Sequence, residues 1–98
     1  MEKKVVITQR FRNHTYSIYK HLIKNFSSKT AFLFLEKIEE RIELLSKHPT
    51  IGKQSFKKKG VRSILLTPHN LIYYRIKKSR IEILCLFDVR RSPEKKPY

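Results

Sequence analysis

Three apolar runs in the C-terminal half, separated by short turn-forming segments, constrain the fold of this chain more than any other feature. The runs cover residues 61–66, 71–76 and 81–89, and each is rich in β-branched, aromatic or leucine residues. The segments between them, residues 67–70 and 77–80, are short enough for hairpins, whereas a parallel pair of strands needs a longer crossover. The pattern therefore predicts a three-stranded antiparallel meander.

The preceding sequence predicts one strand and two helices. Residues 4–8 form a short apolar run that ends in Thr8, a good helix N-cap. Two stripes with helical spacing follow, made of Phe11, Thr15, Ile18, Leu22 and Phe26 in the first helix and of Ala31, Leu35, Ile38, Ile42 and Leu45 in the second. Residues 25–28 interrupt the pattern, and Pro49 disfavours helical geometry at His48, so we expect the second helix to end there.

Together these elements predict a single two-layer α+β domain over residues 1–98. The expected order is strand, helix, helix and three strands (βααβββ), with the helical hairpin packed on one face of a mostly antiparallel sheet. Simple alternation places Ile81, Ile83, Cys85 and Phe87 on one face of the last strand, with Cys85 as a buried thiol. Because the helices can cover only one face, we expect the other face to be a partly open apolar groove with a cationic rim.

The charge of the chain is strongly unbalanced. Twenty-three Lys and Arg residues against eight Asp and Glu residues give a formal net charge of +15. No acidic residue lies between Leu44 and Ile81, a segment that holds ten Lys or Arg residues. A field of this sign favours association with polyanions or with acidic protein surfaces.

Other features of the composition concern compartment and cofactors. A chain with one cysteine forms no intramolecular disulfide and suits a reducing compartment. The sequence has no signal-peptide core and no apolar run that reaches the roughly 18 residues of a membrane span, so we expect a cytoplasmic protein that does not enter a membrane. His14 and His21 share a helix face at a spacing of seven, which is not typical of a metal site. We expect no metal ion and no other cofactor.

Several short segments resemble one protein family. The segments HPTIG, VRSIL, LIYYRI and IEILCLFDVRRSP, in this order within a small basic chain, resemble the RelE/ParE superfamily. Its members are the toxins of bacterial type II toxin–antitoxin modules, which include plasmid-stabilisation systems. The resemblance runs from Val5 to Pro93. It implies a sheet that holds two helices, and an acidic antitoxin that wraps around the toxin and neutralises it.

The superfamily divides by mechanism. RelE-like members cut messenger RNA on the ribosome without a metal, whereas ParE-like members inhibit DNA gyrase. Arg90 matches the RelE arginine that follows the last strand, but Asn70 stands where a second arginine is expected, and Val61 and Ser63 replace two lysines. The segments LIYYRI and DVRRSP look more like the ParE side. The resemblance favours a gyrase inhibitor. A ribosome-dependent endoribonuclease is the alternative, and a basic nucleic-acid-binding domain without toxicity is a third hypothesis.

The candidate site residues depend on the mechanism. A ribonuclease would use Arg90 and Arg62 at the scissile phosphate, with His69 or Tyr98 in proton transfer, although Tyr98 lies two residues beyond the matching position. A binding inhibitor would contact its target through a set of basic side chains: Lys57, Lys58, Lys59, Arg62, Arg75, Arg90 and Arg91. We expect Arg90 and Arg91 to project into solvent, where a guanidinium can meet phosphate or carboxylate. The structural alternative is an ion pair with Asp88 or Glu94.

Overall fold

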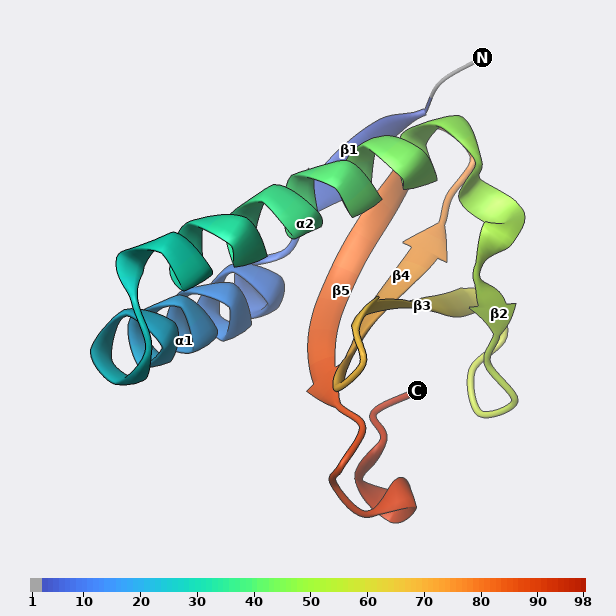
Figure 1. Ribbon diagram of the computed structural model, residues 1–98. Coiled ribbons are helices and arrows are strands. Elements are labelled where there is room, and N and C mark those ends of the chain that lie inside the picture. The colour runs from blue at the N-terminus through green and yellow to red at the C-terminus, as the bar shows by residue number, and fades with distance from the viewer. Residues whose placement is uncertain (1–2) are drawn as a thin grey trace.

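The computed structural model describes residues 3–98 and has the predicted βααβββ order with one added strand (Figure 1). The elements are β1 (Lys4–Ile7), α1 (Gln9–Asn25), α2 (Ser28–Lys47), η1 (Pro49–Ile51), β2 (Lys53–Gln54), β3 (Val61–Thr67), β4 (Asn70–Ile76), β5 (Arg80–Asp88) and η2 (Pro93–Lys95). The short strand β2 is an element that the sequence patterns did not predict. The α+β architecture is confirmed.

Local sequence signals set the ends of both helices. The Thr8 hydroxyl accepts a hydrogen bond from the amide of Phe11 at 3.2 Å, which caps α1. The hydroxyl of Ser27 accepts one from the amide of Thr30 at 3.1 Å and caps α2. The second helix ends at Lys47, directly before His48 and the proline, as the sequence predicted.

The sheet is mixed, in the order β1-β5-β4-β3-β2. The meander of β3, β4 and β5 is antiparallel, and β2 pairs antiparallel with β3. At the opposite edge β1 pairs parallel with β5, with Val5 opposite Ile81. A parallel neighbour is possible here because the chain crosses over through both helices before it returns to the sheet.

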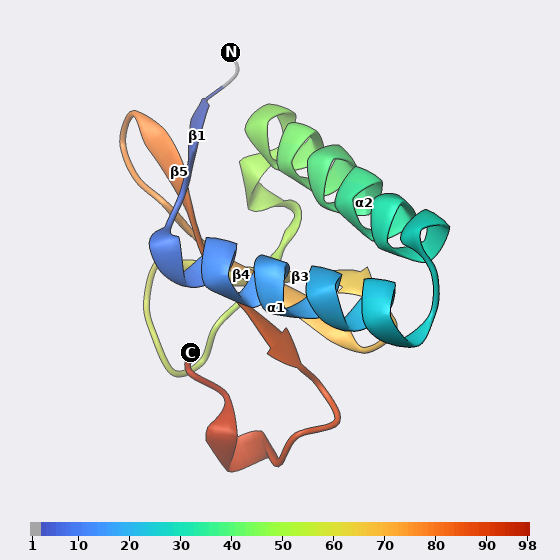
Figure 2. The ribbon, with the colours of Figure 1, turned by 90° about the vertical axis from the view of Figure 1, so that its left-hand side faces the viewer.

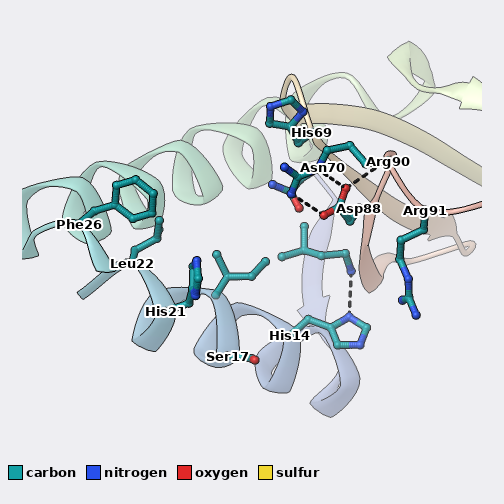
Figure 3. Close-up of a pocket in the computed structure, with 12 residues that line it drawn as sticks. His14, Ser17, His21, Leu22, Phe26, His69, Asn70, Asp88, Arg90 and Arg91 are labelled. Carbon is teal, nitrogen blue, oxygen red and sulfur yellow. Dashed lines mark hydrogen bonds and ion pairs between the residues drawn. The ribbon is translucent and has the colours of Figure 1, made fainter. Parts of the chain in front are cut away.

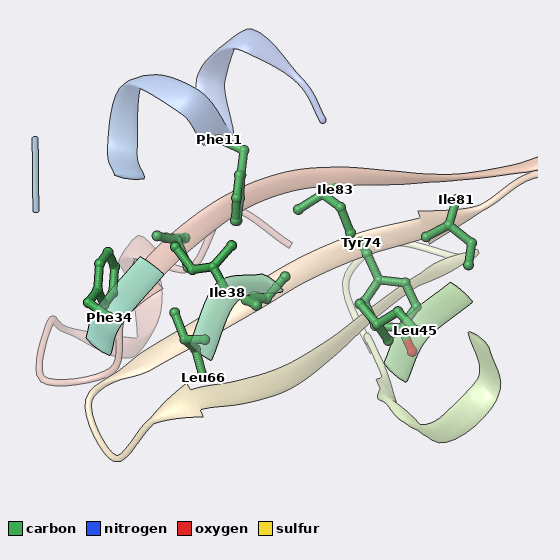
Figure 4. Close-up of a cluster of buried hydrophobic side chains, with 10 residues drawn as sticks. Phe11, Phe34, Ile38, Leu45, Leu66, Tyr74, Ile81 and Ile83 are labelled. Carbon is green, nitrogen blue, oxygen red and sulfur yellow. The ribbon is translucent and has the colours of Figure 1, made fainter. Parts of the chain in front are cut away.

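The two helices lie side by side on one face of the sheet, and the main core is between these layers (Figures 1, 2 and 4). Its buried side chains come from both helices and three strands: Phe11, Phe34, Ile38, Leu45, Leu66, Ile72, Tyr74, Ile81, Ile83 and Leu86. The stripe predicted for α2 is displaced slightly, since Phe34 is buried and Leu35 is only half-buried. This core holds the helical hairpin in place over the sheet.

A β-bulge in β5 overturns the predicted alternation. Tyr73 pairs with Cys85, but the next residue of β4, Tyr74, pairs with Ile83, so that Leu84 has no partner. Ile81 and Ile83 therefore belong to the core under the helices, whereas Cys85 belongs with Phe87 to the cluster on the opposite face. One extra residue moves all later side chains of a strand to the other face. The prediction that all four share one face was wrong.

The second face of the sheet is partly covered by the C-terminal tail (residues 92–98). Val61, Tyr73, Leu84, Cys85 and Phe87 are buried there, with Leu71 and Tyr98 packed against them. The ring centroids of Tyr73 and Tyr98 are 5.5 Å apart. Burial raises the pKa of the Cys85 thiol, as expected for a core cysteine. Tyr98 of the tail therefore fills part of the open apolar groove predicted for this face, and Leu65 remains 54% exposed.

The length and hydrophobicity of the two helices bear on whether either could cross a membrane. Within residues 3–98, neither helix combines the length and the apolar character that a membrane crossing requires.

Candidate functional site

A cleft of about 670 Å³ lies between α1 and the end of the sheet where β4 begins and β5 ends (Figure 3). Its apolar lining consists of Ile18, Leu22, Phe26 and Leu86. Its polar lining consists of His14, Ser17, His21, His69, Asn70, Asp88, Arg90 and Arg91. An apolar groove with a cationic rim was expected on the open face of the sheet, but the structure has it here.

The helical side of the cleft presents two histidines and a serine. His14, Ser17 and His21 are three and four residues apart, so they lie on one face of α1. Nδ1 of His14 accepts a hydrogen bond from the amide of Leu86 at 3.2 Å. This bond requires an unprotonated Nδ1, so the neutral ring carries its proton on Nε2. Burial and the nearby charge of Arg10 lower the pKa of His14.

The strand side of the cleft contains a bidentate ion pair. Asp88 accepts hydrogen bonds from Nε of Arg90 at 3.0 Å and from its terminal nitrogen at 2.7 Å. The backbone amide of Arg90 donates to the same carboxylate at 2.9 Å. These bonds lower the pKa of Asp88 to about 2. The Arg90 side chain projects into solvent as predicted, with 67% of it exposed, but it does so as the partner of Asp88.

His69 reaches the cleft from the turn between β3 and β4. The Thr67 hydroxyl accepts hydrogen bonds from the His69 amide at 3.2 Å and from the Asn70 side chain at 2.9 Å. The carbonyl of His69 also accepts the amide of Val89 at 2.8 Å. These bonds tie the turn to the end of β5, so His69 and Arg90 line the same cleft.

Arg62 and Tyr98, the other two residues predicted for a ribonuclease, have structural contacts elsewhere. The Arg62 guanidinium donates to the carbonyls of Thr50 at 3.1 Å and of Gly52 at 2.7 Å, which fastens η1 to β3. Tyr98 packs on Tyr73 at the opposite face of the sheet. Neither residue lines the cleft that contains Arg90.

Gly52, the glycine of the HPTIG segment, lies where Arg62 holds the chain, and its surroundings explain why a glycine is needed there. The buried hydroxyl of Tyr74 donates to the carbonyl of Pro49 at 2.7 Å and accepts from the amide of Gly52 at 2.9 Å. A Cβ at position 52 would collide with that hydroxyl. This part of the sequence pattern therefore stabilises the fold and does not form the cleft.

The predicted target-binding cations are divided among three places. Arg90 and Arg91 line the cleft. Lys57, Lys58 and Lys59 lie in the connection between β2 and β3, where Lys59 and Arg62 border a smaller hollow of about 410 Å³. Arg75 lies opposite Val61 and Glu82 on the second sheet face. The fold therefore places these cations at three separate surfaces.

Sequence reasoning missed several lining residues of the cleft. His14 and His21 were considered only as metal ligands, although their shared helix face was the signal that could have placed them together with Ser17. Asp88 was considered only as a possible partner for an arginine. Among residues 3–98, no three His, Cys, Asp or Glu side chains converge in a way that could hold a metal ion.

Comparison with known proteins assigns the family. A family model described as the ParE toxin of the type II toxin–antitoxin system parDE matches residues 5–93. This chain belongs to the ParE toxin family. It is therefore a toxin of the type II toxin–antitoxin class within the RelE/ParE superfamily. No curated protein matches this ParE-family toxin in sequence.

Solved structures share its fold at low sequence identity. The chromosomal ParDE system from P. aeruginosa contains a chain with 20% identity and a TM-score of 0.75, and the match covers 89% of this toxin and 96% of that chain. The YoeB/ParE toxin from Agrobacterium tumefaciens has 20% identity and a TM-score of 0.62, with 87% and 96% covered. The RelBE2 toxin–antitoxin complex from Mycobacterium tuberculosis has 17% identity and a TM-score of 0.62, with 90% and 99% covered. At sequence identities of 20% or less, these matches show a shared fold only.

Proposed function

We propose that this ParE-family toxin inhibits DNA gyrase by binding to it, without chemistry of its own, and that an acidic antitoxin neutralises it. The observation that carries the proposal is the dispersal of the groups that a ribonuclease would need. A metal-independent ribonuclease requires its acid, base and cations within hydrogen-bonding reach of one phosphate. Here Arg62 is bonded to backbone carbonyls and Tyr98 packs on Tyr73, while only His69 and Arg90 share the cleft. A binding inhibitor needs no such convergence.

The cleft is the surface that we propose for the antitoxin. Its lining, Ile18, Leu22 and Phe26, suits apolar side chains of an amphipathic segment. Arg90 and Arg91 at the rim suit acidic side chains, and the net charge of +15 favours an acidic partner over longer distances. The solved RelBE2 complex of the same fold supports an antitoxin partner for this chain.

The salt dependence of binding kinetics tests this part of the proposal. Raising ionic strength from low to physiological values should slow association with the antitoxin far more than it changes dissociation. An association rate that does not depend on salt would show that charge does not guide the two proteins together.

Two assays in parallel test the proposed target. Purified toxin should inhibit supercoiling by gyrase, and controlled expression should arrest growth without creating new transcript 5′ ends. Arg90→Ala/Arg91→Ala should lose inhibition and keep its fold. Arg80→Ala is the matched control, because Arg80 pairs with Glu82 at 3.0 Å on the same strand but lies outside the cleft. New 5′ ends with normal supercoiling would reject gyrase as the target.

A RelE-like endoribonuclease is the second candidate, and one observation favours it. The cleft brings His69 together with the ion-paired Arg90. His69 would transfer the proton, and Arg90 would stabilise the charge on the phosphate. If this is the activity, His69→Ala should abolish the new 5′ ends in the same mapping experiment. Because the chain belongs to a family of toxins, we set aside the third hypothesis, a nucleic-acid-binding domain without toxicity.

A further inference from the structure

The connection between β2 and β3 presents an exposed aromatic ring among lysines. This basic loop comprises residues 55–60, and Phe56 at its start is 98% exposed. The three residues that follow it are Lys57, Lys58 and Lys59. Burying apolar surface is favourable, so a protein gains nothing in its own stability from a fully exposed phenyl ring. The ring is therefore fully available for contact with a ligand.

Hydrogen bonds within the basic loop hold its backbone in place. The amide of Ser55 donates to the carbonyl of Val61 at 2.8 Å, which continues the pairing of β2 with β3. The hydroxyl of Ser55 accepts the amides of Lys57 and Lys58, each at 3.1 Å. Gly60 has a φ of 84°, a conformation that favours glycine, and closes the loop. A preformed loop loses little entropy when it binds.

The charge around Phe56 is positive. The Nζ of Lys53 lies 5.9 Å from the centroid of the Phe56 ring. Lys57 donates to the carbonyl of Lys96 at 2.6 Å, so the C-terminal tail with its own lysines lies against the loop. The sequence has no acidic residue between Glu43 and Glu82, and the tail adds Lys95 and Lys96 together with Glu94. A ligand that is anionic and can stack on an aromatic ring suits this loop.

We propose that the basic loop binds single-stranded nucleic acid, with Phe56 stacked on an unpaired base and the lysines on neighbouring phosphates. Aromatic stacking together with backbone cations is the usual chemistry of single-strand binding. A duplex is a poorer ligand, because opening one stacked base step costs about as much as one stacking contact returns. A membrane surface is also a poorer ligand, since it binds a broad apolar face and this loop offers one ring.

Fluorescence anisotropy of the purified full chain can test this proposal in the absence of gyrase. The probe is an oligothymidylate of about 12 nucleotides, compared with a duplex of the same length. Phe56→Ala should weaken single-strand binding by about 5- to 150-fold, and Phe56→Tyr should restore most of it. Lys58→Ala should lower the slope of log affinity against log salt by about 0.7, whereas Phe56→Ala should leave that slope unchanged.

Phe32→Ala is the matched control. Phe32 is also an exposed phenylalanine, at 60%, but it lies on α2 with Glu36 one turn away. This variant should bind the oligonucleotide as the wild type does.

Three results would overturn the proposal. Unchanged affinity in Phe56→Ala would reduce the loop to a nonspecific electrostatic contact. An equal dependence on Phe56 for duplex and single strand would indicate a wedge between base pairs. Binding to phosphatidylglycerol vesicles that depends on Phe56, without binding to the oligonucleotide, would indicate a membrane ligand. None of these results bears on gyrase, so this test and that of the proposed target fail independently.

Discussion

The two faces of the sheet are covered in different ways. Two helices cover one face and bury ten side chains in a continuous core, among them Phe11, Ile38 and Tyr74. On the other face five residues are buried, and Tyr98 of the C-terminal tail packs against them. Since stabilisation follows the apolar area removed from water, the first face should supply most of the stability of the domain.

The difference also bears on function. The proposed sites are the cleft beside α1 and the basic loop after β2. The apolar floor of the cleft (Ile18, Leu22 and Leu86) is shared with the helix-side core, whereas Arg90 at its rim is ion-paired and Phe56 on the loop is exposed. Changes in the helix-side core should therefore affect stability, and changes at the cleft should affect binding. Substitutions in each region test this separation.

The largest expected effect comes from the helix-side core. Ile38→Ala should lower the free energy of unfolding by about 2–5 kcal/mol, because it leaves a cavity between α2 and the sheet. Chemical denaturation measures the loss. Leu44→Ala on the same helix is the control, since Leu44 is 38% exposed and its truncation should change stability by less than about 0.5 kcal/mol. Equal effects of the two variants would mean that α2 does not pack through Ile38.

A smaller effect is expected on the tail-covered face. Tyr98→Ala should lower the free energy of unfolding by about 0.5–1.5 kcal/mol, which corresponds to the loss of its aromatic contact with Tyr73. The same denaturation experiment applies, with Tyr16→Ala on the exposed surface of α1 as control. A loss as large as that of Ile38→Ala would show that the tail-covered face contributes as much to stability as the helix-covered face.

The smallest effect on stability is expected at the cleft, where the readout is a titration. The pKa of Asp88 is about 2, below the value of about 3.9 for an unperturbed aspartate. A lowered carboxylate pKa means that the stabilisation is complete above about pH 4 and is lost as the pH falls through about 2. Between pH 5 and 8 the pair should remain intact.

Carboxyl NMR can measure this titration directly. Arg90→Ala should return the Asp88 midpoint to its ordinary range, because the hydrogen bonds from Arg90 are the main cause of the shift. Arg80→Ala should leave the midpoint near 2, since Arg80 pairs with Glu82 at the other end of β5. If Asp88 titrates normally in the wild type, the bidentate pair does not persist in solution.

Much of this architecture follows from local sequence. Thr8, Ser27 and Pro49 mark helix boundaries because their effects act within one or two turns of the backbone. The three C-terminal runs predict the meander for the same reason: each gap permits a hairpin. The charge of the chain and its single cysteine are properties of composition and need no fold.

Tertiary structure alone decided the register of β5 and the composition of the cleft. Residues 81–87 contain only one charged side chain, Glu82, so hydrophobic alternation cannot locate an extra residue, and the bulge at Leu84 depends on pairing with β4. The cleft joins His14 to His69 and Arg90, which are 55 and 76 positions further along the chain. Their meeting depends on how α1 packs across the sheet, because short-range patterns carry no information about contacts at that separation.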